Sequence, residues 1–204
     1  IDISSPVEAD RRHSLRQILE AVEAAALLGV HYFVIHPGPE NADIPSKAER
    51  LERIENVVGV LNEVAARCSS LGIRCVLENK LPHLLFGDST DILWILGSLK
   101  GTETGACLDT GHALLAGELH QLVHKLAPFL RMLHVHDNHG SADEHLPPGD
   151  GVIDWRGLLR DLARVRFQGT MILEVAGCDD PAATMERARR GRGVLREIAR
   201  SVAM

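Results

Sequence analysis

The segment GACLDTGH, residues 105–112, holds the pattern from which this chain can be interpreted. A short β-prone apolar run ends in a carboxylate at Asp109, and His112 follows three residues later. Four other segments show the same order of apolar run, side chain able to bind a metal, turn and helical pattern. They are HYFVIH (31–36), IRCVLEN (73–79), LRMLHVHD (130–137) and TMILEV (170–175). This repetition predicts five strands that alternate with helices.

Strands that alternate with crossover helices build a parallel sheet. When such a sheet closes into a (β/α) barrel, the carboxyl ends of the strands meet at one face, where the active sites of these barrels lie. We therefore expect an α/β fold of the TIM-barrel type, as a single domain over residues 1–204. A complete barrel has eight strands and about 250 residues. We expect this chain to hold about the last five βα units and to lack the first strands, roughly 70–80 residues by the same rule.

Several helix starts are marked by capping residues. Ser5 with Glu8, and Ser46 with Glu49, match the capping-box spacing of a serine followed three residues later by a glutamate. Asp154 is placed to cap a helix that runs to about residue 164. We expect the segment between the last two strands, residues 138–154, to form a long polar loop.

Composition excludes several classes of protein. The hydrophobic content is 45% and the charged content 25%, both ordinary for a globular enzyme. The net charge of −6 argues against a general nucleic-acid or anionic-membrane surface. No apolar run approaches the roughly 20 residues of a membrane span. Four widely spaced cysteines without a C-x-x-C motif indicate buried free thiols, and hence a cytoplasmic protein. They are Cys68, Cys75, Cys107 and Cys178.

The residues at four of the strand ends predict a metal centre. They are Glu78, Asp109, His134 and Glu174. Three carboxylates and one imidazole favour Mn²⁺, Mg²⁺ or Co²⁺, and also suit Zn²⁺. A divalent ion there would polarise a carbonyl and an adjacent hydroxyl of a sugar. Carboxylates beside the substrate could then move a proton off and back onto carbon. Each residue alone fits an ordinary buried polar side chain, but clustered carboxylates without a cation would be costly.

A second set of residues able to bind a metal accompanies the first. It consists of His36, His112, Asp143 and His145. Three imidazoles favour Zn²⁺, although the same side chains could instead bind substrate hydroxyls. We expect loop 138–154 to bring Asp143 and His145 close to His112. His136 is interpreted as a supporting partner of the metal centre, and His120 and His124 as part of a solvated helix face.

Together the motifs resemble those of the xylose isomerase-like TIM-barrel superfamily. This superfamily joins sugar isomerases and epimerases with apurinic-site endonucleases of the endonuclease IV class. The resemblance covers nearly the whole chain. The segments that carry it are VIHPG (34–38), LEN (77–79), CLDTGH (107–112), LHVHDN (133–138), DEHLPPGDGVIDW (143–155) and LEV (173–175).

The resemblance to the epimerases implies one divalent ion held by Glu78, Asp109, His134 and Glu174. It also implies that the two glutamates act as acid and base on opposite faces of a sugar or sugar phosphate. His36, His112 and Asn79 are then the expected substrate-binding residues. The resemblance to the endonucleases implies instead up to three zinc ions. In that case His36, His112, Asp143 and His145 join the first four residues as metal ligands.

Charge and aromatic content favour the isomerase or epimerase reading. The chain is acidic and has only two Trp, one Tyr and four Phe with which to contact nucleic-acid bases. The second interpretation is a zinc phosphodiesterase acting on abasic DNA. The third is a barrel that no longer catalyses a reaction. We also expect strands 31–36 and 170–175 to be open sheet edges through which two copies could associate.

Overall fold

The computed structural model describes residues 1–40, 45–100 and 104–202. Two compact units make up the chain, Ile1–Cys107 and Leu108–Met204. Strand β3 (Gly105–Asp109) begins in the first unit and ends in the second. The strand order of the sheet is β1-β2-β3-β4-β5. The α/β fold and the five strands expected from the sequence are therefore confirmed.

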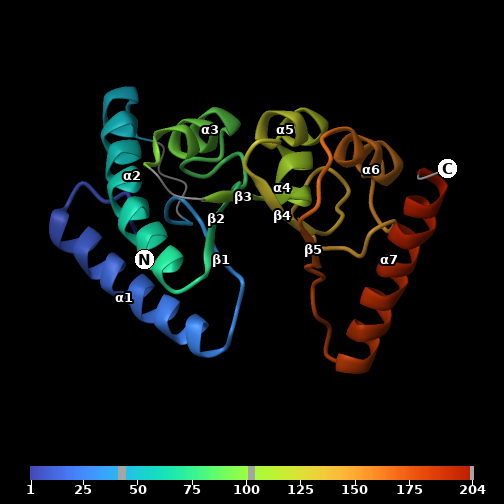
Figure 1. Ribbon diagram of the computed structural model, residues 1–204. Coiled ribbons are helices and arrows are strands. Elements are labelled where there is room, and N and C mark those ends of the chain that lie inside the picture. The colour runs from blue at the N-terminus through green and yellow to red at the C-terminus, as the bar shows by residue number, and fades with distance from the viewer. Residues whose placement is uncertain (41–44, 101–103, 203–204) are drawn as a thin grey trace. The chain divides into compact units, whose positions relative to one another are not determined.

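In the first unit, helices and strands alternate from the start. Its elements before β3 are α1 (Glu8–Leu27), β1 (Tyr32–Ile35), α2 (Lys47–Ser70), β2 (Arg74–Glu78) and α3 (Ser89–Ser98). Strands β1 and β2 are parallel, with Val34 opposite Val76, and β2 is parallel to β3, with Leu77 opposite Ala106. Helices α1 and α2 pack side by side (Figure 1).

A single apolar stripe on α2 anchors the core of this unit. Val57, Leu61, Val64 and Cys68 recur at the three- and four-residue spacing of one helix face, and all four are fully buried. Helix α2 contacts β2, whose interior residues Val76 and Leu77 are also fully buried.

In the second unit, the polypeptide continues from β3 into two short helices. The elements are α4 (Thr110–Leu115), α5 (Leu119–Leu126), β4 (Leu130–Val135), α6 (Trp155–Arg164), β5 (Thr170–Leu173) and α7 (Pro181–Val202). Strands β4 and β5 are parallel, with His134 opposite Ile172. Helix α6 packs against both α5 and α7 (Figure 1).

The predicted helix caps are partly correct. The Ser46 hydroxyl accepts a hydrogen bond from the Glu49 amide at the start of α2, and Asp154 accepts one from Gly157 at the start of α6. The capping box at Ser5 is wrong. Ser5 Oγ accepts from the Val7 amide instead, so that it closes a turn before the helix, and α1 begins only at Glu8.

The sheet order leaves β1 and β5 at its edges, as expected, and β5 is largely exposed, with Met171 at 37% and Ile172 at 43%. One expectation about burial needs correction. Cys178 is exposed, whereas Cys68, Cys75 and Cys107 are buried free thiols as expected. Cys178 lies in the irregular segment between β5 and α7, where its thiol donates to the Asp180 carbonyl rather than packing into a core. Among the described residues, no helix is both long and apolar enough to cross a membrane.

Candidate metal centres

Asp109 is the last residue of β3 and also the N-cap of helix α4, which follows directly. Its Oδ1 accepts a hydrogen bond of 2.7 Å from the His112 amide, which caps the helix. His112 therefore lies within a short helix that follows the strand directly. Both side chains are buried, Asp109 completely. Because the carboxylate is tied to the helix start, its direction is set by the backbone.

His134 and Glu174 meet at the ends of β4 and β5. His134 Nδ1 lies 3.2 Å from Glu174 Oε2. Asp109, His134 and Glu174 each offer one ligand atom, and these atoms lie within 4.8 Å of one another. Three of the four residues predicted for the first metal centre thus converge within the second unit.

The fourth residue, Glu78, ends β2 in the first unit. Its side chain is only 7% exposed and lies 3.3 Å from His36 Nε2, while His36 Nδ1 lies 2.8 Å from Glu40. The hydrogen bond with Glu78 raises the pKa of His36, and Glu40 adds to the effect, although partial burial opposes it. Asn79 follows Glu78 and is buried.

The sequence interpretation missed Lys80, the next residue. Its side chain is fully buried, and Nζ donates to the carbonyls of Gly38 and Pro39. Burial lowers the pKa of Lys80, opposed by the nearby carboxylate of Glu40. The sequence signal that could have identified it is a lysine directly after the LEN motif at a strand end. In the structure it ties the end of β2 to the turn after His36.

A second group of ligand atoms lies wholly within the second unit. Its members are His112, His136, Asp143 and His145, with all four ligand atoms within 4.8 Å of one another. Asp143 Oδ2 lies 3.4 Å from His112 Nε2 and 3.2 Å from His145 Nε2. The expected approach of Asp143 and His145 to His112 is therefore confirmed.

Asp137 organises the loop that carries this group. Its backbone pairs with Leu146 in an antiparallel bridge of two hydrogen bonds, 2.8 and 2.9 Å long, which closes the base of the loop. Its buried carboxylate accepts hydrogen bonds from the amides of Gly149 and Ile153 and from the Trp155 indole, the last at 2.7 Å. Asp137 thus closes the base of the loop through its backbone and fixes the second half of the loop through its carboxylate.

His136 contacts Asp109, in agreement with its interpretation as a supporting partner of the first metal centre. Strand β4 ends at Val135, and His136 begins the loop with its side chain completely buried. Its Nε2 lies 2.9 Å from Asp109 Oδ2, and its ring stacks on His145 at a centroid distance of 3.9 Å. Burial tends to lower the pKa of His136, but the hydrogen bond with Asp109 and the nearby charge of Asp143 outweigh it and raise that pKa. The carboxylates of Asp109 and Asp143 therefore stabilise a positive charge on the His136 ring.

The other predicted histidines lie elsewhere. His120 Nδ1 lies 2.7 Å from the buried carboxylate of Asp161, and His124 Nε2 lies 3.4 Å from it. The two histidines are therefore half-exposed partners of the buried Asp161 carboxylate rather than part of a purely solvated face.

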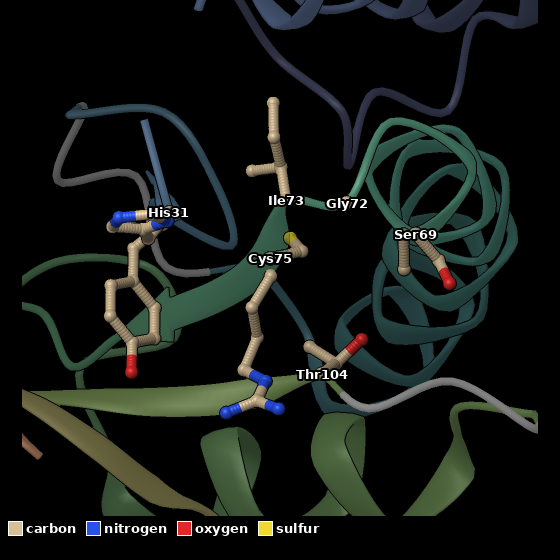
Figure 2. Close-up of a pocket in the computed structure, with 9 residues that line it drawn as sticks. His31, Ser69, Gly72, Ile73, Cys75 and Thr104 are labelled. Carbon is tan, nitrogen blue, oxygen red and sulfur yellow. The ribbon is translucent and has the colours of Figure 1, made fainter. Parts of the chain in front are cut away.

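A pocket of about 320 Å³ lies in the first unit, at the amino ends of β1 and β2. Figure 2 shows His31, Ser69, Gly72 and Thr104 around it. It is at the opposite end of β2 from Glu78, and no carboxylate is among the described residues that line it. In barrel folds this end of the strands serves stability rather than chemistry.

Comparisons with known proteins agree with the fold and the motifs. An uncharacterized protein of Methanocaldococcus jannaschii is 29% identical over 187 residues, which are 88% of this chain and 62% of the relative. Fructoselysine 3-epimerase of Shigella flexneri is 25% identical over 168 residues, covering 81% of this chain and 59% of the epimerase. Probable endonuclease 4 of Mycoplasma genitalium is 23% identical over 187 residues, covering 85% and 62%. The chain thus spans about three fifths of the length of these relatives.

A solved structure gives the same result. The crystal structure of a D-tagatose 3-epimerase-like protein superposes with a TM-score of 0.80 at 27% identity, covering 97% of this chain and 75% of that protein. A family model described as xylose isomerase-like TIM barrel matches residues 1–198. The chain belongs to the xylose isomerase-like TIM-barrel family.

Proposed function

We propose that this chain carries most of the active site of a divalent-metal-dependent sugar isomerase or epimerase, acting on a sugar or sugar phosphate. The observation that carries the proposal is the convergence of Asp109, His134 and Glu174 at the ends of consecutive strands. Support comes also from the likeness to a D-tagatose 3-epimerase-like protein and to fructoselysine 3-epimerase.

The donor set fits one divalent cation. Asp109 is completely buried and the His134 side chain is 14% exposed, whereas Glu174 is the more exposed partner, at 46%. We propose that Glu78 completes the set as a third carboxylate, which makes it suitable for Mn²⁺, Mg²⁺, Co²⁺ or Zn²⁺. When bound, the cation would polarise the substrate carbonyl and so acidify the neighbouring C–H bond.

Glu78 and Glu174 then carry the proton. One carboxylate takes the proton from the carbon beside the carbonyl, and the electron pair of the broken C–H bond is delocalised toward the carbonyl oxygen. The other carboxylate supplies a proton to the opposite face of the same carbon, which inverts its configuration. Proton loss and gain balance, so the step needs no oxidant or reductant.

His36, His112 and Asn79 are proposed to bind substrate oxygens. His36 lies beside Glu78, at 3.3 Å, and His112 is held by the Asp109 cap. An imidazole can donate or accept a hydrogen bond according to its tautomer. These side chains would orient the carbon–hydrogen bond relative to the two glutamates.

The second candidate function is a zinc phosphodiesterase that acts on abasic DNA. The specific observation in its favour is the group of His112, Asp143 and His145, since the endonuclease resemblance implies further metal ligands at these positions. The likeness to a probable endonuclease 4 supports the same candidate. The acidic net charge of −6 weighs against it.

Incubation with ketopentoses and ketohexoses, free and phosphorylated, in D₂O with Mn²⁺ or Co²⁺ tests the first proposal. Epimerisation should be accompanied by one deuterium at the inverted carbon, detected by NMR and mass spectrometry. A Glu174→Gln variant should lose both turnover and metal retention, while His139→Gln serves as the matched control because His139 is exposed and paired with Glu144. Cleavage of an abasic-site oligonucleotide, without deuterium exchange into any sugar, would support the second candidate instead.

A further inference from the structure

The group of His112, His136, Asp143 and His145 has the dimensions of a tetrahedral metal site. Ligand atoms 2.0–2.1 Å from a tetrahedral Zn²⁺ lie roughly 3.3–3.4 Å apart. Asp143 Oδ2 lies 3.4 Å from His112 Nε2 and 3.2 Å from His145 Nε2, and Asp143 Oδ1 lies 3.9 Å from His136 Nδ1. The His136 and His145 rings stack in parallel at 3.9 Å, so one of them must also rotate for all four ligand atoms to surround one ion.

Two atoms of this group are buried and have no hydrogen-bond partner. They are His136 Nδ1 and Asp143 Oδ1, as judged over the described part of the chain. His136 is completely buried. Leaving a buried polar atom unpaired is energetically costly, so both atoms point to a ligand that the polypeptide itself does not supply. A lone pair and a carboxylate oxygen that face each other repel unless a positive charge lies between them, which either a proton on Nδ1 or a metal ion supplies.

In His136 and His145, the ring nitrogen that is not a proposed ligand forms a hydrogen bond with another residue. In the neutral ring this leaves the lone pair on the nitrogen that is the proposed ligand. His136 Nε2 lies 2.9 and 3.0 Å from the two oxygens of Asp109, which can only accept, so Nε2 carries the hydrogen and Nδ1 keeps its lone pair. His145 Nδ1 lies 2.9 Å from the Glu174 carbonyl oxygen, which likewise leaves Nε2 as the acceptor. Metal-binding histidines are commonly oriented by such carboxylate and carbonyl partners.

The chain makes room for His136 at Gly111. A Cβ atom at this glycine would lie 2.0 Å from His136 Cε1 and 2.6 Å from Nδ1. Only glycine therefore allows the imidazole to lie flat beside the start of α4. The backbone of His145 has a φ of 48°, in the left-handed region, and its Nδ1 lies 2.9 Å from the Glu174 carbonyl oxygen.

We propose that His136 is the fourth protein ligand of a closed Zn²⁺ site formed with His112, Asp143 and His145, and that this site is structural. The family resemblance implies only the other three as ligands and therefore an open coordination position. Four protein ligands leave no position for water or substrate, which is the property of structural zinc sites. The ion would join α4, the end of β4 and the loop 138–154, and so hold the loop in place. The inference goes beyond the proposed isomerase function. It assigns His112 to the zinc ion, so that His36 and Asn79 remain as the proposed substrate-binding residues.

A His134→Ala background disables the first centre, so that zinc bound to the full chain reports on this one. X-ray absorption of the zinc-loaded protein should show three imidazoles and one carboxylate oxygen, with no water. With Co²⁺ in place of Zn²⁺, the visible spectrum of a four-coordinate site should appear and stay unchanged when azide is added. Adding His136→Gln should weaken zinc binding by about tenfold or more and reduce the imidazole count to two, whereas His139→Gln should change neither.

A count of two imidazoles in the parent, or an azide-sensitive cobalt spectrum, would overturn the proposal whether or not the His136→Gln variant folds. Unchanged zinc affinity and imidazole count in a folded His136→Gln variant would do so as well. Ketose epimerisation with Mn²⁺, measured separately on the protein without these substitutions, tests the proposed function. A negative result in the zinc-binding experiment therefore says nothing about epimerisation, and a negative result in the epimerisation assay says nothing about zinc binding.

Discussion

Asp109 and His136 form a completely buried pair, with His136 Nε2 2.9 Å from Asp109 Oδ2 and 3.0 Å from Oδ1. Asp109 also belongs to the group with His134 and Glu174, whereas His136 belongs to the group with Asp143 and His145. One carboxylate therefore touches both candidate centres. It is proposed as a ligand of the first and acts as the orienting acceptor of the second.

Replacing Asp109 by Asn should weaken both centres together. If the amide oxygen keeps the hydrogen bond from the His112 amide, the NH2 group takes the place of Oδ2, and this donor would face the N–H of His136 Nε2. We expect metal at the first centre to be lost, and zinc affinity at the second to fall by about 10–100-fold. Metal analysis with competitive chelator titration measures both. An unchanged second centre would show that Asp109 does not orient His136.

Asp137→Asn should loosen the loop 138–154 without removing any proposed ligand. The carboxylate accepts hydrogen bonds from backbone amides and from the Trp155 indole, and an amide group would turn a donor toward some of them. We expect a stability loss of about 2–3 kcal/mol. In a Trp94→Phe background, which removes the exposed tryptophan, the fluorescence should shift to the red as Trp155 becomes solvated. Asp150→Asn, at an exposed loop position, is the matched control.

Cys178 should be the thiol that alkylating reagents reach in the native protein. It is exposed, and hydrogen bonds from Thr184 and at Asp180 lower its pKa, assisted by the charge of Arg187. Cys68, Cys75 and Cys107 are buried. Iodoacetamide and intact-mass analysis should show one modified cysteine in the folded protein, and four after denaturation. The Cys178→Ser variant should show none when folded, and rapid labelling of that variant would contradict the burial of the other three.

Asp161→Asn should destabilise the second unit in a pH-dependent manner. Burial tends to raise the pKa of Asp161, but hydrogen bonds with His120 and Arg164 outweigh it, so the folded pKa lies below the ordinary value. The folded state therefore binds this proton less readily than the unfolded state, whose aspartate titrates near about 3.9. The stabilising effect is complete above that value and is lost as the pH falls through the folded pKa.

At pH 6 we expect the Asp161→Asn variant to be about 1 kcal/mol less stable than the parent, since the partner side chains are half-exposed or more. Urea unfolding at several pH values measures the difference, which should shrink below about pH 4. Glu186→Gln is the control, because Glu186 forms only an exposed pair with Arg189 on α7 and should change stability by less than about 0.5 kcal/mol. A difference independent of pH would show that packing, not charge, explains the effect of Asp161.

The sequence alone determined the elements and the ligand types. Apolar runs of strand length, separated by helical patterns, are local features, so the five strands could be located without any contact being known. Glu78, Asp109, His134 and Glu174 stand at the strand ends for the same reason, since a strand of known extent places its last residue. Ser46 and Asp154 were identifiable as caps because a cap acts on an amide two or three residues away.

Tertiary structure decided which of several histidines belongs to which group. His136 could have continued β4 on the same face as His134, and only the pairing of Asp137 with Leu146 ends the strand at Val135. The direction of its Nδ1 depends on Asp109, 27 residues away in the sequence, and on the space left by Gly111. A tautomer and a ring orientation are set by such distant partners, which no local pattern encodes. The residues of the candidate metal centres can therefore be found in the sequence, whereas their assignment to one group or the other depends on packing.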